Sequence, residues 1–167
     1  MSLHPATFPA KELLTLCDVR RQRRSGPGGQ HRNKVETAVV ITHRESGLQG
    51  AASERRSQQQ NHQVALFRLR INLALGQRII PAQKAASELW SQRNRGGQIS
   101  ISPQHEDFPS LLCEALDRVT LLQGDVAKAA RQLDTSSSQL LKLLRHTPRA
   151  FEQVNMLRQQ NDLKKLY

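Results

Sequence analysis

Residues 1–53 alternate between irregular and extended patterns. Residues 1–10 (MSLHPATFPA) are expected to be a loose terminus. In LLTLCDVR at 13–20, apolar and polar positions alternate, which favours a strand. VETAVVITH at 35–43 is rich in β-branched residues and predicts another strand. RESG at 44–47 then predicts a turn and LQGAAS at 48–53 a short strand, so the last two strands should form a hairpin.

A helical pattern begins at Ser57 and continues to Gly76, a residue typical of a helix end. Pro81 is well placed in the first turn of a second helix, which should run to about Asn94. GGQISISP at 96–103 alternates between Ile and polar residues and should be extended. Capping and breaking residues then delimit four more helices, at roughly 110–122, 125–132, 136–146 and 149–160.

This order of elements predicts an α+β chain with two domains. Residues 1–105 should contain the predicted strands, two of them paired as a hairpin, and the long helix. Residues 106–167 should be entirely α-helical.

The charge of the chain is concentrated in its first part. The net charge is +11, with 25 Lys and Arg against 14 Asp and Glu. Residues 1–105 hold 16 basic and 6 acidic residues, and residues 106–167 hold 9 and 8. Such an excess points to a polyanionic partner, with nucleic acid as the first choice and a membrane surface as the alternative. The polyanion should therefore bind the first part of the chain.

Other features of the composition exclude several classes of protein. Cys17 and Cys113 are far apart, so we expect two free, buried thiols rather than a disulfide framework or a zinc site. The six histidines lack metal-ligand spacing, and we predict neither a metal nor a cofactor. The sequence has no long apolar run and no signal peptide. We therefore expect a cytoplasmic protein without a membrane partner, and a monomer by default.

A glycine-rich loop with basic flanks carries the candidate chemistry. It reads SGPGGQHRNK at 25–34, and the stretch from Arg20 to Lys34 contains six basic but no acidic residues. Two adjacent glycines let a ligand approach the backbone closely, and the flanking charges would hold the loop against phosphates. A second Gly-Gly-Gln, at 96–98, lacks these flanks and precedes an extended segment. We interpret the second copy as a turn.

The loop and three other motifs resemble class I peptide chain release factors. SGPGGQHRNKVETAV is similar to the catalytic loop of that family, ITHRESG to its hairpin, and RRSQQQNHQVAL to the start of its long helix. Cys17 stands where the family often has a strand cysteine. The motifs occur in the family's order over residues 12–75. The resemblance implies the family's small Gly-Gly-Gln domain, an antiparallel β-sheet packed on a long helix, for this part of the chain.

The resemblance assigns the catalytic role to Gly28, Gly29 and Gln30. In that family the loop enters the peptidyl-transferase centre and promotes attack of water on the ester of peptidyl-tRNA. The backbone N–H of Gln30 would stabilise the charge that develops on the ester oxygens, while its side chain would admit water and exclude larger nucleophiles. The family's glutamine is often N5-methylated, so Gln30 is a candidate for modification by a glutamine methyltransferase. The sequence shows no Ser/His/Asp catalytic set.

The implied partners are the rRNA of the large ribosomal subunit and peptidyl-tRNA. Basic and polar residues of the loop, its neighbourhood and a later helix are the candidate RNA contacts: Arg20, Arg21, Arg23, Arg24, Ser25, Pro27, His31, Arg32, Asn33, Lys34, Arg55, Arg56, Lys142 and Arg145.

The remaining sequence favours a codon-independent member of the family, of the type that rescues stalled ribosomes. We find no candidate motif for reading stop codons. GDVAKAARQLDTSSSQLLKLL, from Gly124 to Leu144, resembles a bacterial helix-turn-helix, although a plain helical hairpin accounts for the same pattern. Two other functions stay open: a ribosome-binding factor that does not hydrolyse, and a nucleic-acid-binding regulator that uses the helix-turn-helix.

Overall fold

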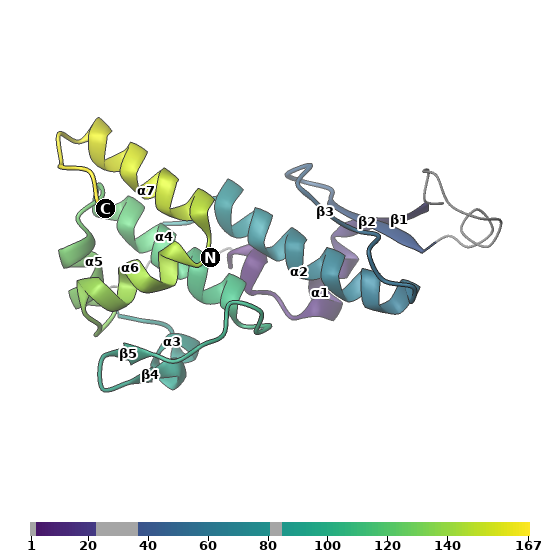
Figure 1. Ribbon diagram of the computed structural model, residues 1–167, viewed down its shortest axis with the longest axis horizontal. Helices are drawn as coiled ribbons and strands as arrows, with labels where there is room; N and C mark the ends of the chain where they lie inside the picture. The colour runs from purple at the N-terminus through teal and green to yellow at the C-terminus, as the bar shows by residue number, and fades with distance from the viewer. Residues whose placement is uncertain (1–2, 23–36, 81–84) are drawn as a thin grey trace. The chain divides into compact units, whose positions relative to one another are not determined.

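The computed structural model describes residues 3–22, 37–80 and 85–167. The chain forms two compact units, Met1–Gly76 and Gln77–Tyr167 (Figure 1). The first is a mixed α/β unit with a small antiparallel sheet, and the second is mainly helical, which confirms the predicted fold class. Among the described residues, every helix is too short or too polar to cross a lipid bilayer. The predicted division into domains at residue 105 stays a prediction.

The first unit contains a short 3-10 helix, two α-helices and three strands. They are η1 (Pro5–Thr7), α1 (Ala10–Thr15), β1 (Cys17–Gln22), β2 (Ala38–His43), β3 (Gln49–Ala52) and α2 (Gln58–Gly76). The predicted hairpin and long helix are confirmed.

Two expectations for the N-terminal residues were wrong. The segment expected to be loose is packed, because Pro5 and Ala6 are buried and the Arg70 guanidinium of α2 donates a hydrogen bond to the Ala6 carbonyl at 3.0 Å. The segment expected to be a strand from residue 13 is first a turn of helix, in which Leu13 is buried and its N–H bonds the Pro9 carbonyl at 3.0 Å. The strand begins only at Cys17.

The sheet has the order β1-β2-β3, with antiparallel neighbours throughout. Alternate residues of β2 are buried, with Val39, Ile41 and His43 on the inner face. Helix α2 packs on the sheet (Figure 1). The closest approach is at Gly50 of β3, where a Cβ would lie 2.0 Å from the carbonyl oxygen of Ala65 on α2. Only glycine fits there, because a backbone atom occupies the space of any side chain.

Polar side chains of α2 also bond the backbone of β3, a strand at the edge of the sheet. The Arg68 guanidinium donates to the Ala51 carbonyl at 2.7 Å, and the Asn72 amide donates to the Gln49 carbonyl at 2.7 Å. These bonds satisfy edge groups that would otherwise be open to another strand.

The second unit begins with a short helix and a small hairpin, and four longer helices follow. They are α3 (Glu88–Arg93), β4 (Asn94–Arg95), β5 (Gln98–Ile99), α4 (Phe108–Leu121), α5 (Val126–Gln132), α6 (Ser137–Arg145) and α7 (Pro148–Gln160). The four predicted helices of residues 110–160 are confirmed. The helix expected from Pro81 begins at Glu88 in the described residues, where the Ser87 hydroxyl caps it by accepting the N–H of Trp90.

Helix α4 forms the centre of the second unit. Eleven of its fourteen residues are buried, including Leu111, Leu112 and Leu116. Trp90 of α3 is also fully buried, and its indole N–H donates a hydrogen bond to the Leu133 carbonyl at 2.8 Å. This bond satisfies the one polar group of a large apolar side chain.

The second Gly-Gly-Gln is a turn, as predicted. Gly96 and Gly97 connect the antiparallel strands β4 and β5, and both have positive φ angles, of 58° and 87°. Two successive positive φ values are typical of the tight hairpin turns that glycine favours. The glycines of this copy therefore allow the tight turn between β4 and β5.

Candidate functional site

The candidate catalytic segment is attached to the sheet at both of its ends. Gln22, the last residue of β1, pairs with Ala38, the first residue of β2. The segment between them contains eleven predicted site residues that lie outside the described residues: Arg23, Arg24, Ser25, Pro27, Gly28, Gly29, Gln30, His31, Arg32, Asn33 and Lys34. The structure describes the residues on which the two ends of this segment are fixed: the ends of β1 and β2 and the side chains that contact them. We call these residues the frame of the site.

Asn61, in the first turn of α2, is central to that frame. Its side chain is fully buried and makes three hydrogen bonds to backbone groups. The amide donates to the Thr37 carbonyl at 2.6 Å and to the Arg55 carbonyl at 2.9 Å, and Oδ1 accepts the Arg55 N–H at 2.9 Å. One side chain thus joins Thr37, where the chain returns to the sheet, to the loop before α2. An amide suits this position because it both donates and accepts.

Four predicted RNA contacts gather at this end of the sheet. Arg20 and Arg21 lie on β1, and Arg55 and Arg56 follow β3; all four are exposed. The register places them together, because Arg21 pairs with Val39, which pairs in turn with Ala52 at the end of β3. Cations therefore surround the point where the candidate catalytic segment leaves and re-enters the sheet. Such a cluster is suited to hold RNA phosphates.

The acidic residue nearest to this cluster in sequence, Glu54, is already engaged. Its carboxylate accepts the Ser53 N–H at 2.9 Å and pairs with the Arg68 guanidinium at 2.7 Å. These hydrogen bonds, the backbone one first, lower the pKa of Glu54 to about 2. The partners of its carboxylate are thus Arg68 of α2 and the backbone of its own loop.

The motif ITHRESG has a structural role at the opposite end of the sheet. His43 is buried, and its Nδ1 lies 2.9 Å from the Ser46 hydroxyl inside the β2–β3 turn. Arg44 donates to the Cys17 carbonyl at 2.9 Å and to the Thr15 carbonyl, which ties this turn to the end of α1. Burial raises the pKa of the Cys17 thiol, in keeping with an unreactive core cysteine.

In the second unit, the predicted contacts Lys142 and Arg145 are exposed on α6. They face different neighbours. Arg145 lies over the ring of Phe151 at 5.1 Å and donates a hydrogen bond to the Tyr167 carbonyl. Lys142 lines a cleft between α6 and the segment that follows the β4–β5 hairpin.

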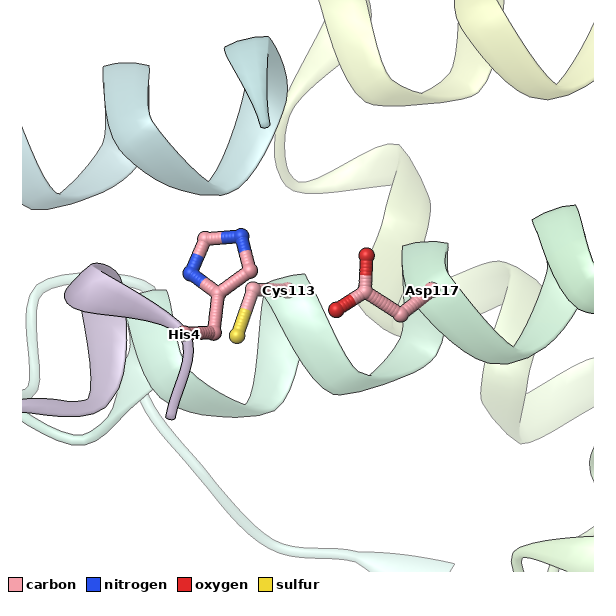
Figure 2. A group of neighbouring side chains, drawn as sticks. All are labelled: His4, Cys113 and Asp117. Carbon is pink, nitrogen blue, oxygen red and sulfur yellow. The ribbon is translucent and has the colours of Figure 1, made fainter. Parts of the chain in front are cut away.

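The second unit also contains a buried ionisable group that the sequence did not reveal. Cys113 and Asp117 lie one helical turn apart on α4 (Figure 2). The third side chain drawn in Figure 2 is His4 of the first unit, whose Nδ1 accepts the Ala6 N–H. Burial raises the pKa of Asp117 to about 7, although the Arg78 guanidinium at 3.7 Å opposes the shift. Cys113 is a free, buried thiol, as predicted for both cysteines.

Comparison with known proteins assigns a large part of the chain to one family. The RF-1 domain model matches residues 15–106. Peptide chain release factor 1 of Acidiphilium cryptum is 43% identical over 112 residues, which are 62% of this chain and 32% of that protein. Peptide chain release factor 1 of Chlorobaculum tepidum is 41% identical over 87 residues, 52% of this chain and 24% of that protein. Peptide chain release factor 2 of Lactiplantibacillus plantarum is 53% identical over 51 residues, 30% of this chain and 14% of that protein.

The similarity has clear bounds. The chain spans about a quarter to a third of the two release factors 1, and less of the release factor 2. No solved structure matches it. The matched region 15–106 includes the Gly-Gly-Gln segment, the three strands, α2 and the small hairpin.

Proposed function

The chain belongs to the class I peptide chain release factor family, and we propose that it releases peptides by hydrolysing the ester of peptidyl-tRNA on the large ribosomal subunit. The observation that carries the proposal is the family match across Gly28, Gly29 and Gln30, in a segment mounted on paired ends of the sheet. The exposed arginines around those ends support rRNA as the surface on which the segment is held.

The proposed chemistry uses the backbone of the segment. The N–H of Gln30 would donate to the oxygen on which charge develops as water attacks the ester carbon. Glycines at 28 and 29 would let the main chain come close enough to the ester for this bond. The Gln30 side chain would line the space for the attacking water, and its N5-methylation by a methyltransferase belongs to the same proposal. The reaction needs no metal or cofactor in this scheme.

We further propose that these 167 residues act without reading a codon, as ribosome rescue requires. In support, α3 to α7 form a compact helical unit beyond the sheet and α2, and we find no stop-codon-reading motif in it. The helical unit would then serve to select the ribosomal state. The proposal includes a cytoplasmic location and a monomer acting on a single ribosome.

The test is peptide release from ribosomes or large subunits that carry labelled peptidyl-tRNA. Gly29→Ala should lower the release rate by about 10²–10³, the usual cost of a misplaced oxyanion donor, while ribosome binding persists. Gly96→Ala is the control from the second copy: its Cβ would have no neighbour within 4 Å, so only its φ of 58° opposes the change. It should release peptide at the original rate.

Three outcomes would decide against parts of this proposal. Undiminished peptide release by Gly29→Ala would contradict the catalytic role of the Gly-Gly-Gln segment. Binding of the unaltered chain without any release would indicate a non-hydrolytic ribosome-binding factor. Release that depends on a stop codon in the decoding site would exclude codon-independent action.

A further inference from the structure

The second unit contains a polar cleft that the proposed chemistry does not use. Its volume is about 420 Å³, and it is lined by helix α6 and by strand β5 with residues 100–102. Among the described residues that line it, four have cationic or protonatable side chains and none is a carboxylate: Arg93, His105, Lys142 and His146. A cleft with this lining favours an anionic ligand.

One wall of the cleft is a single face of α6 and the residue that follows it. Gln139, Lys142 and His146 recur at intervals of three and four residues, which places them on the same side of a helix. Lys142 and His146 line the cleft, and the His146 and Phe108 rings form a T-shaped pair with 6.1 Å between their centroids. The structure gives Lys142 no ion pair within the described part of the chain. Its ammonium group is therefore available to a ligand.

The opposite wall is fixed to α6 through the turn that precedes it. The Asn94 amide donates to the Asp134 carbonyl at 2.7 Å, and the Thr135 hydroxyl donates to the Gly97 carbonyl at 2.6 Å. These bonds join the β4–β5 hairpin to the residues just before α6. Ser100 adds an exposed hydroxyl along this wall. The two walls are thus held in place before any ligand binds, which reduces the entropic cost of binding.

Arg93 contributes less free charge to the cleft than Lys142 does. Its guanidinium pairs with the Asp107 carboxylate at 2.5 Å and lies 3.2 Å from Nε2 of His105. The ion pair holds the guanidinium in place and neutralises much of its charge. The net positive charge of the cleft therefore depends mainly on Lys142, with hydrogen-bond donors around it.

We propose that this cleft binds the phosphodiester backbone of RNA, with Lys142 as the main phosphate contact. Strand β5 and residues 100–102, which are not helical, form this wall, so a polymer backbone can lie along it, and the donors along both walls suit phosphate oxygens. The choice of RNA among polyanions rests on the proposed function. Because the cleft belongs to the second unit, it would give the chain an RNA contact separate from the arginines around β1 and β3.

The test measures binding of the full chain to a fluorescein-labelled single-stranded RNA, by anisotropy, at several salt concentrations. Lys142→Gln should weaken binding several-fold and lower the slope of log K against log salt by about 0.7, the value for one contact to a single strand. Lys165→Gln is the matched control, since it removes the same charge from an exposed position of the second unit outside the cleft. It should leave the slope unchanged.

A second measurement follows the His146 imidazole by NMR during the RNA titration. Its signals should shift in the original chain and much less in Lys142→Gln. Equal slopes for the Lys142 and Lys165 variants, or unmoved His146 signals, would overturn the proposal. Competition by a poly-glutamate peptide as strong as that by RNA would also overturn it, in favour of an acidic protein as the ligand.

The outcomes are separable from those of peptide release. A Gly29→Ala chain that releases no peptide should still show the Lys142-dependent RNA binding. A chain that releases peptide normally but binds RNA independently of Lys142 would refute RNA binding by the cleft and leave the proposed function intact.

Discussion

The side-chain amide of Asn61 donates a hydrogen bond of 2.6 Å to the carbonyl of Thr37, the residue just before β2. Through this bond the first turn of α2 holds the end of the candidate catalytic segment. Asn61→Ala should therefore affect both stability and activity. We expect a decrease in stability of about 2–3 kcal/mol, because backbone groups are left without partners, and a fall in release on the order of tenfold from misplacement of the segment. Urea denaturation and the release assay measure the two effects.

Two further variants separate the hydrogen bonds of Asn61 from its size. Asn61→Asp keeps an acceptor for the Arg55 N–H but cannot donate to the two carbonyls, so it should be as harmful as Asn61→Ala. Gln63→Ala, at an exposed position of α2, should change neither stability nor release. A stable and active Asn61→Asp chain would show that the donated bonds do not hold the segment.

Gly50 gives a sharp prediction about the packing of the sheet on α2. A Cβ at this position would lie 2.0 Å from the Ala65 carbonyl oxygen and 2.3 Å from the Leu69 nitrogen. Gly50→Ala should cost about 3 kcal/mol, the upper end for overpacked sites, because backbone atoms cannot turn away as side chains do. Gly47→Ala is the comparison: its Cβ meets nothing within 4 Å, and only its φ of 69° opposes the change. We expect about 1 kcal/mol there. Equal destabilisation in circular dichroism melts would contradict the close approach.

Asp117 should make the stability of the second unit depend on pH. Its pKa is about 7 in the folded state, against an ordinary value of 3.8, because burial disfavours the charged form. The folded state therefore holds a proton that the unfolded chain releases between these two values. The stabilisation is complete below about pH 4 and disappears as the pH rises through 7, a change on the order of a few kcal/mol. Asp117→Asn should flatten this slope in urea titrations followed by Trp90 fluorescence. An unchanged slope would mean that Asp117 titrates normally.

The arginines beside β3 should set the salt dependence of ribosome binding. Replacing Arg55 and Arg56 by Gln removes two exposed charges from the loop that follows β3. For each phosphate that is no longer neutralised, the slope of log K against log salt should fall by up to about 0.9, and binding to large subunits should weaken. Lys11→Gln removes an exposed charge on α1, at the other end of the sheet, and should have little effect. Equal effects of both changes would indicate only a general attraction between opposite charges.

Much of the fold was predictable, because most elements have strong local signals. The β-branched run at 35–43 and the turn after it led to β2 and β3, and capping residues such as Ser136 marked the starts of helices. The boundary of β1 was not predictable in the same way. Alternation in 13–20 suggested strand throughout, but the burial of Leu13 and the bonds from Arg44 favour a helical turn before Cys17. That choice depends on interactions with residues far away in the sequence.

The frame of the candidate site was harder to predict than its chemistry. The Gly-Gly-Gln segment has a recognisable sequence, whereas Asn61 appeared only as one letter of a helix-start motif. Its three bonds depend on how β2, the 53–57 loop and α2 meet. Likewise, alternation in 96–103 predicted an extended segment, but not that residues 98–102 would line a cleft with α6. Such pairings are tertiary and have no short-range pattern.

The chain contains a single tryptophan, and the structure buries it completely in the second unit. Indole emission therefore reports only on the unit of residues 77–167, whereas the backbone ellipticity of the chain sums both units. A difference in midpoint between the fluorescence and the ellipticity transitions would reveal whether the helical unit unfolds while the sheet of the first unit persists. Trp90 is thus a native, site-specific probe for asking whether the two halves of the molecule melt as one or independently.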